Sequence, residues 1–281
     1  MTKQAKDVWL KLVCLPIAFC ATHAFATEAR LLPRQALYPN YLADPLRPTF
    51  NAQLQYYGNS EIADTGNNRF DLKLGARLPL YQSSFHQHPW QWVLLGGFHG
   101  QFDNTNTQDN IGWDGIYGLS LVAQQTPQLA WRFGIKHISA HIGDELIQRT
   151  GRQRIGYTRE EWRLGVAWSP EATSTFYTEA GYAYGLRNSV LQKPWRIQLG
   201  GQYRHPARFW QQRFQWYSAL DLSSYQENHW QLNTDLQLGI STHSGDHQWR
   251  LGLEFYNGRS QLGEFFQDRE RYIGAGLWFD I

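Results

Sequence analysis

From Thr49 to the last residue, apolar and polar residues alternate with a period of two. In the segment Phe70–Leu80 the even positions are apolar, whereas Arg69, Asp71 and Lys73 occupy the intervening odd positions. Side chains of a β-strand point alternately to opposite faces, so each such segment predicts a strand with one apolar face. The apolar faces fall within Phe50–Tyr56, Phe70–Leu80, Trp90–Phe98, Trp113–Leu121, Leu129–His141, Trp162–Trp168, Phe176–Tyr184, Trp195–Tyr203, Phe214–Leu222, Trp230–Ile240, Trp249–Phe255 and Ile273–Ile281.

These segments predict an all-β protein, a transmembrane antiparallel β-barrel of about twelve strands. An even strand number is typical of barrels in the outer membrane of Gram-negative bacteria. The composition agrees, because mean hydropathy is low at −0.54 while Phe, Trp and Tyr make up 15% of the chain. Polar residues that face a lumen and aromatic belts at the two membrane interfaces account for both values.

The faces opposite the apolar ones carry charges of both signs. Arg132, Lys136 and Glu161 are examples. Isolated charges inside a narrow barrel need partners, so we expect salt bridges among the inward-facing residues. A selective pore would favour rings of one sign, which these strands lack.

The first 26 residues have the pattern of an export signal. Lysines precede the short apolar run Leu12–Ala21, and Ala24-Phe25-Ala26 is a small-x-small cleavage site, so we expect the mature chain to begin at Thr27. Both cysteines lie in this leader, which leaves the mature chain without cysteine chemistry. Residues 27–48, with four prolines, predict an irregular periplasmic segment before the barrel of residues 49–281.

Net charge and the lengths of the connections indicate which partners the chain can have and which end of the barrel faces the periplasm. Without the leader the chain has 23 Lys and Arg against 23 Asp and Glu, so no basic surface for nucleic acid is indicated. Short connections such as Gln125–Pro127 predict periplasmic turns, and longer ones such as Ala140–Arg154 predict outer loops. The expected partners are outer-membrane lipids and the barrel-assembly machinery, which reads an alternating terminal strand like the one ending at Ile281.

The segment Leu129–His141 carries the candidate chemistry. Its apolar face ends in His137, Ser139 and His141, so polar groups lie where a lipid head group would be. If Trp131 and Trp168 mark the same interface, Ser139 and Glu160 lie at equal height on neighbouring strands.

These residue types suit an acyl-ester hydrolase. Ser139 would be the nucleophile, His137 the base and Glu160 the orienting carboxylate, with His141 as an alternative base. Backbone amides around Gly143, or a divalent cation such as calcium held by Asp144 and Glu145, would stabilise the oxyanion.

Two resemblances bear on this site. The His137-Ile138-Ser139 pair resembles that of outer-membrane phospholipase A and the lipid A deacylases, which carry it on an outward-facing strand with a third polar residue on the next strand. Here that third position, at a shorter interval after the serine, is Gly151. The segments Leu37–Pro48, His137–Glu145 and Tyr256–Phe265 are similar to a bacterial family of unknown function whose members are thought to be exported outer-membrane barrels. That family's motif has a second serine where this chain has Ala140.

Two functions remain open on these residues. One is an outer-membrane lipid acyl-ester hydrolase acting on phospholipid or lipid A. The other is a non-enzymatic barrel, either a narrow channel or a structural protein of the envelope, in which the histidines and Ser139 are interfacial residues. In the second interpretation Asp144 and Glu145 are simply solvated loop residues.

Overall fold

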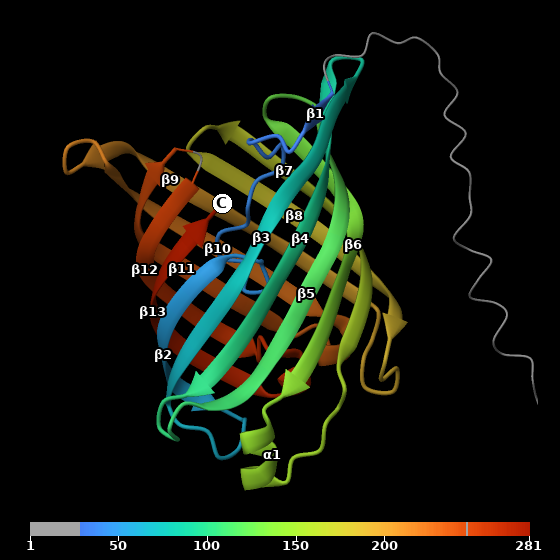
Figure 1. Cartoon of the computed structure of the whole chain (residues 1–281), viewed down its shortest axis with the longest axis vertical. Helices are drawn as coiled ribbons and strands as arrows, with labels where there is room; N and C mark the ends of the chain where they lie inside the picture. Colours follow the sequence, from blue (N-terminus) through green and yellow to red (C-terminus); the bar gives the residue numbers. More distant parts are fainter. Residues whose placement is uncertain (1–28, 246) are drawn as a thin grey trace, which may run out of the picture.

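Twelve antiparallel strands close into a barrel in residues 29–245 and 247–281, the part of the chain that the computed structural model describes (Figure 1). Each strand pairs with its neighbour along the chain, and β13 pairs with β2 to close the circle. The strands are β2 (Phe50–Ser60), β3 (Asn68–Phe85), β4 (His88–Asp103), β5 (Asp109–Gln124), β6 (Leu129–Ile142), β7 (Thr158–Glu171), β8 (Ser174–Leu186), β9 (Trp195–Phe209), β10 (Phe214–Tyr225), β11 (Leu232–Ser244), β12 (His247–Arg259) and β13 (Arg269–Asp280).

The alternation in the sequence therefore predicted the fold. Each of the twelve predicted segments overlaps one strand, with two differences at segment ends: Ile281 follows the end of β13, and β11 begins after Trp230. This residue has a φ of 60° and belongs to the turn before β11, because the left-handed backbone at His229 and Trp230 interrupts the extended chain. A further short strand, β1 (Arg30–Leu31), pairs with β3 outside the barrel circuit. No helix in the described residues is long and apolar enough to cross a membrane.

The two ends of the barrel differ in their connections. At one end the strands are joined by short turns, and the C-terminus and β1, where the described chain starts, also lie there (Figure 1). At the other end lie the longer loops, which include α1 (Asp144–Thr150), η1 (Gln226–Asn228) and η2 (Gly263–Phe265). Short turns face the periplasm in outer-membrane barrels, and on this rule the long-loop end is called the outer end below.

Burial alternates along the strands as the sequence pattern requires. In β6 the even positions Arg132, Lys136 and Ile138 are buried, whereas Phe133 on the opposite face is exposed. The outward face of the barrel is accordingly apolar, with exposed Leu, Ile, Trp, Tyr and Phe side chains on every side. This is the surface that a bilayer would cover.

Ion pairs between nearby strands line the lumen, as expected for charges of both signs on the inward faces. Glu179 on β8 accepts from both Arg132 and Arg196. Glu161 on β7 pairs with Arg159 at 2.7 Å and with Arg196 at 3.1 Å. Because these side chains are almost fully buried, their mutual pairing offsets the cost of removing charges from water.

Residues 37–47, which precede β2, lie inside the barrel, whereas β1 pairs with β3 at the short-turn end. Leu37 and Leu42 donate their backbone N–H groups to inward-facing glutamines, at 3.0 Å in each case. The Tyr41 ring stacks on Tyr177 of β8 with 3.6 Å between centroids, and Arg47 pairs with Asp280 at 2.5 Å. The expected export signal lies outside the described residues. Within the segment expected to be irregular, residues 37–47 bind inward polar groups of the barrel wall.

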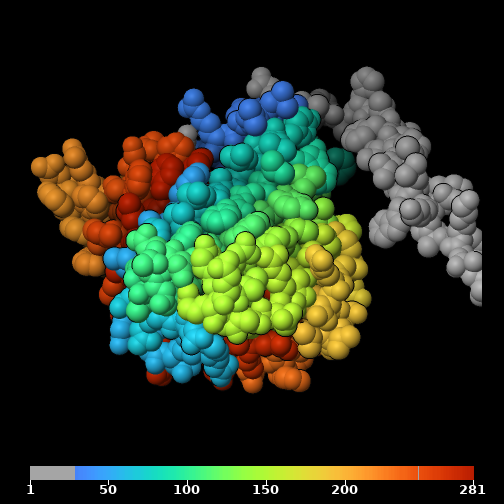
Figure 2. Space-filling model, turned by 60° about the horizontal axis from the view of Figure 1, so that its bottom comes forward, coloured from blue at the N-terminus to red at the C-terminus, as the bar shows by residue number. Residues whose placement is uncertain are grey.

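The outer mouth is covered by the long loops. Leu262 and Phe265 are fully buried beneath α1, and the backbone N–H of Gly263 donates to Asp114 of β5 at 3.0 Å. Figure 2 shows the segment around α1, in yellow-green, lying across this end. The lumen is therefore filled from both ends by the chain's own segments.

Candidate active site

The candidate residues lie on the outward face near the outer end of β6. His137, Ser139 and His141 share that face, since the even positions between them are buried toward the lumen. Three residues after Ser139 the strand ends at Ile142 and leads into α1. The predicted outward orientation of these three side chains is thus confirmed. Next to the site, toward the middle of the barrel, the outward face is apolar.

The register between β6 and β7 differs from the predicted one by two residues. His137 is opposite Glu160, and Ser139 is opposite Thr158. The prediction placed Ser139 level with Glu160 because it set Trp131 and Trp168 at one height. In the structure Trp168 pairs with Leu129, so the two tryptophans are offset.

This register joins the predicted base to the predicted orienting group. Nδ1 of His137 lies 2.5 Å from Oε1 of Glu160. The Glu160 side chain packs against Gly185, which lies opposite it on β8. A Cβ atom on residue 185 would be only 2.9 Å from Cγ of Glu160. A carboxylate that accepts from Nδ1–H leaves Nε2 as the acceptor nitrogen of a neutral imidazole.

Ser139 makes its hydrogen bond to the other histidine. Its Oγ lies 3.3 Å from Nε2 of His141, and no hydrogen bond joins it to His137 in the described structure. The predicted contact between Ser139 and His137 is therefore absent in this conformation. His137 and His141 are the same-face neighbours two residues before and after Ser139, so a side-chain rotation changes which histidine Oγ faces.

Strand β5 supplies partners that the sequence analysis did not identify. The rings of Trp113 and His141 stack with 4.0 Å between centroids, and those of Tyr117 and His137 stack with 4.2 Å. Gly115 lies between them, directly opposite Ser139. The face beside Ser139 is thus open between two aromatic stacks. The sequence does place Trp113, Gly115 and Tyr117 on one outward face of β5. The alternation alone, however, indicated only that this face is apolar and did not show that it packs against the histidines.

The predicted oxyanion and metal groups are not assembled around Ser139. The N–H of Gly143 donates to the carbonyl of Ile111 at 2.9 Å, so it is already used. Asp144 and Glu145 are exposed in the first turn of α1, and Asp144 pairs with Arg154 at 2.7 Å. Within residues 29–245 and 247–281, no three His, Cys, Asp or Glu side chains are placed to hold a metal ion.

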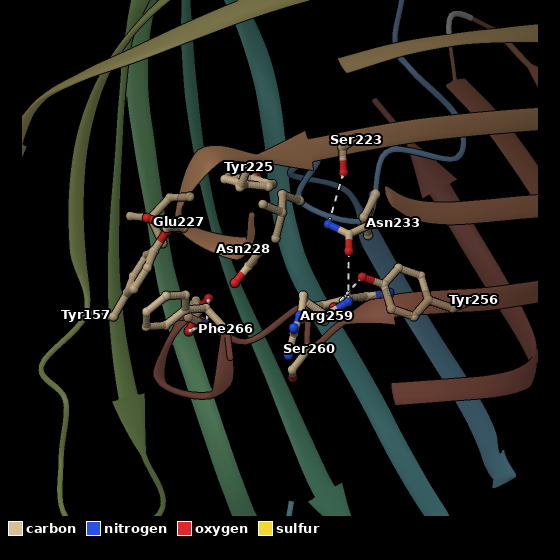
Figure 3. A pocket seen from close by; sticks show the side chains of 16 residues that line it. Tyr157, Ser223, Tyr225, Glu227, Asn228, Asn233, Tyr256, Arg259, Ser260 and Phe266 are labelled. Atoms are coloured by element: carbon tan, nitrogen blue, oxygen red, sulfur yellow. Dashed lines mark hydrogen bonds between the residues drawn. The ribbon is translucent and has the colours of Figure 1, made fainter. Parts of the chain in front are cut away.

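A second polar feature lies inside the barrel. A cavity of about 50 Å³ separates the N-terminal segment from the loop that contains η2 (Figure 3). Asn228, Tyr225 and Glu227 border it on one side, and Arg259 and Ser260 on the other. A space of this size, bordered in part by polar side chains, has room for a few water molecules.

The cavity is the meeting point of the three segments that resemble the family of unknown function. Leu46 comes from the first, Ile138 from the second, and Tyr256 from the third. Lys73 joins two of them, donating to the carbonyl of Pro45 at 2.9 Å and to Oε1 of Gln261 at 3.4 Å. These segments therefore hold the filled lumen together, and only the second also carries residues of the outward site.

A family model described as "Protein of unknown function (DUF1207)" matches residues 11–281. The chain belongs to the DUF1207 family. No curated protein sequence matches it. The family confirms the resemblance found in the sequence, and the twelve-stranded barrel is the fold of this member.

Solved structures similar to this DUF1207 chain include outer-membrane phospholipases. Outer membrane phospholipase A from Escherichia coli has a TM-score of 0.58 and 12% identity, covering 83% of this chain and 92% of the other. The Salmonella typhi outer membrane phospholipase dimer with bound calcium has a TM-score of 0.59 and 11% identity, covering 87% and 95%. At these identities the likeness shows the fold, which is that of outer-membrane β-barrel proteins.

Proposed function

We propose that this DUF1207 protein is an outer-membrane hydrolase that cleaves an acyl ester of a membrane lipid. The observation that carries the proposal is the His137–Glu160 pair, 2.5 Å apart, beside an outward-facing serine. An imidazole held through Nδ1 by a carboxylate is the arrangement that activates a serine hydroxyl. The position at the outer end of an apolar wall suits a substrate whose ester lies at the membrane interface.

The reaction assigns one role to each residue. Ser139 rotates from His141 toward His137, and its Oγ attacks the acyl carbonyl carbon while His137 Nε2 takes the hydroxyl proton. The ester C–O bond then breaks, and the departing alcohol takes that proton. Water, deprotonated by His137, then attacks the acyl carbon. The bond between that carbon and Oγ of Ser139 breaks, Oγ takes the proton back from His137, and the fatty acid leaves. Catalytic contacts are often long or misaligned without substrate, which is consistent with the resting contact to His141.

The competing proposal is a barrel without enzymatic activity. The filled lumen favours a closed structural barrel over a narrow channel, because the N-terminal segment and the η2 loop both occupy the interior. In that case the histidines would serve only as interfacial residues that stack on Trp113 and Tyr117.

Purified protein in mixed micelles distinguishes the two proposals. The micelles would hold a diacyl phospholipid in one series and lipid A in another, and released fatty acid would be measured by mass spectrometry. We expect release from one series with wild type and none with Ser139→Ala, while Thr158→Val retains activity. Absence of release from both substrates by folded wild type would exclude the hydrolase.

A further inference from the structure

The hairpin of β9 and β10 leaves the barrel wall at the short-turn end. The register of the two strands shifts between two residue pairs, Arg204 with Tyr217 and Arg208 with Gln215. Three residues of β9 therefore lie opposite the single residue Trp216 of β10. Pro206 lies in the middle of these three and has no N–H to donate to the ladder. Such a bulge bends a strand, and the orange hairpin projects sideways from the barrel in Figures 1 and 2.

The projecting hairpin combines aromatic and cationic side chains. Residues 203–216 contain five aromatic residues and three arginines but no Asp or Glu. Trp210 at the tip is 73% exposed and stacks on Phe214, while Arg208 and Arg213 are exposed beside it. Exposed tryptophan with neighbouring arginine is typical of the region of phospholipid head groups.

An apolar groove begins at the base of this hairpin. It has a volume of about 690 Å³ and runs across the outward faces of β9 to β12. Ser218 lies in it, paired with Tyr203 on one side and Leu238 on the other, so a short side chain is flanked by two large ones. His205 and Trp216 line the end nearest the hairpin.

We propose that the groove and hairpin bind one diacyl phospholipid with an anionic head group, from the leaflet at the short-turn end. An acyl chain fills the groove beside Ser218, and Arg208 and Arg213 face the phosphate. Charge complementarity selects this occupant, because the segment is purely cationic and the groove is apolar. The proposal rests on the membrane position of the barrel and not on hydrolysis, since Ser139 lies at the opposite end.

Native mass spectrometry tests this binding. The refolded full chain would be released from detergent micelles with equal amounts of phosphatidylglycerol and phosphatidylcholine. We expect one retained phosphatidylglycerol per protein. Arg208→Gln with Arg213→Gln should weaken retention about tenfold, since each arginine near an anionic lipid contributes to affinity. Arg271→Gln, an exposed arginine at the outer end, should leave it unchanged.

Substitutions at Ser218 test the contribution of the groove separately from that of the arginines. Ser218→Phe should fill the groove and abolish retention of both lipids, whereas Ser218→Ala should behave like wild type. Should a variant fail to refold, a photoactivatable phosphatidylglycerol on wild type gives an independent test, with labelled peptides expected within residues 203–218. Equal retention of the two lipids, retention unaffected by Ser218→Phe, or labels confined elsewhere on the barrel would each overturn the proposal. The proposal would also be overturned if the wild type formed a dimer and Ser218→Phe dissociated that dimer without reducing lipid retention.

Discussion

Nδ1 of His137 and Oε1 of Glu160 lie 2.5 Å apart across strands β6 and β7. The pair directs the acceptor nitrogen of the imidazole away from the carboxylate and leaves Ser139 as its neighbour on the same face. In the proposed reaction this geometry is needed to keep Nε2 free for the serine proton.

Removing the carboxylate charge should therefore slow the reaction without unfolding the barrel. We expect Glu160→Gln to lower kcat about 100-fold, within the range that a general base contributes. The thermal midpoint should change little, because the Glu160 side chain is 35% exposed. Full activity in Glu160→Gln would contradict the assigned role of Glu160.

The two histidines should differ in importance. His137→Gln should reduce ester hydrolysis about 1,000-fold, because it removes the oriented base. His141→Gln removes the resting contact of Ser139 and the stack on Trp113 but leaves the oriented base in place, so it should cost less than about tenfold. Initial rates with a short-chain phospholipid measure both. A larger loss of activity in His141→Gln than in His137→Gln would show that His141 is the base, the alternative that the sequence analysis left open.

The sequence predicted the barrel well because an apolar outward face and a polar lumen impose strict alternation on every strand. It also predicted that His137, Ser139 and His141 face outward, which follows from the same phase. It did not predict the strand register, because the tilt of the strands offsets Trp131 from Trp168 by two residues. The stacking partners Trp113 and Tyr117 were missed for the same reason, since only register places them opposite the histidines.

The position of residues 29–48 was also beyond the sequence pattern. No periodicity marks this segment, and its place in the lumen depends on scattered contacts such as the Tyr41–Tyr177 stack. Contacts between distant parts of the chain leave no local signal in a single sequence.

Removal of this segment should leave the loops at the outer mouth as the remaining barrier in the described barrel, so conductance should appear in steps when those loops open. In planar bilayers we expect little conductance from wild type and discrete conductance steps from a variant lacking residues 29–48. The physical reason is that Leu42 and Arg47 lie inside the barrel, bonded to its wall. Equal, steady conductance from both proteins would show that the segment does not block the lumen.

The same segment should contribute to stability. Tyr41 is almost fully buried, so Tyr41→Ala should lower the free energy of unfolding by about 3 kcal/mol, as measured for large aromatic-to-alanine changes. Urea unfolding in micelles checks this, with exposed Tyr56→Ala as the control. Equal losses in the two variants would show that the lumen contact is not the cause.

The lumen ion pairs give a further test. Glu179→Gln leaves Arg132 and Arg196 with a neutral partner and should destabilise the barrel by about 3 kcal/mol, because buried charges lose their compensation. The exposed Glu171→Gln should change stability by less than about 0.5 kcal/mol. A lack of difference between the two midpoints of urea unfolding would show that the network contributes no net stability.

The hydrolase proposal is tested most directly by the lipids of cells that express the protein. Mass spectrometry of the envelope should show deacylated phospholipid or lipid A with wild type and not with Ser139→Ala, at equal amounts of heat-modifiable, assembled barrel. Identical lipid profiles from the two strains would contradict the proposal that Ser139 is a catalytic nucleophile.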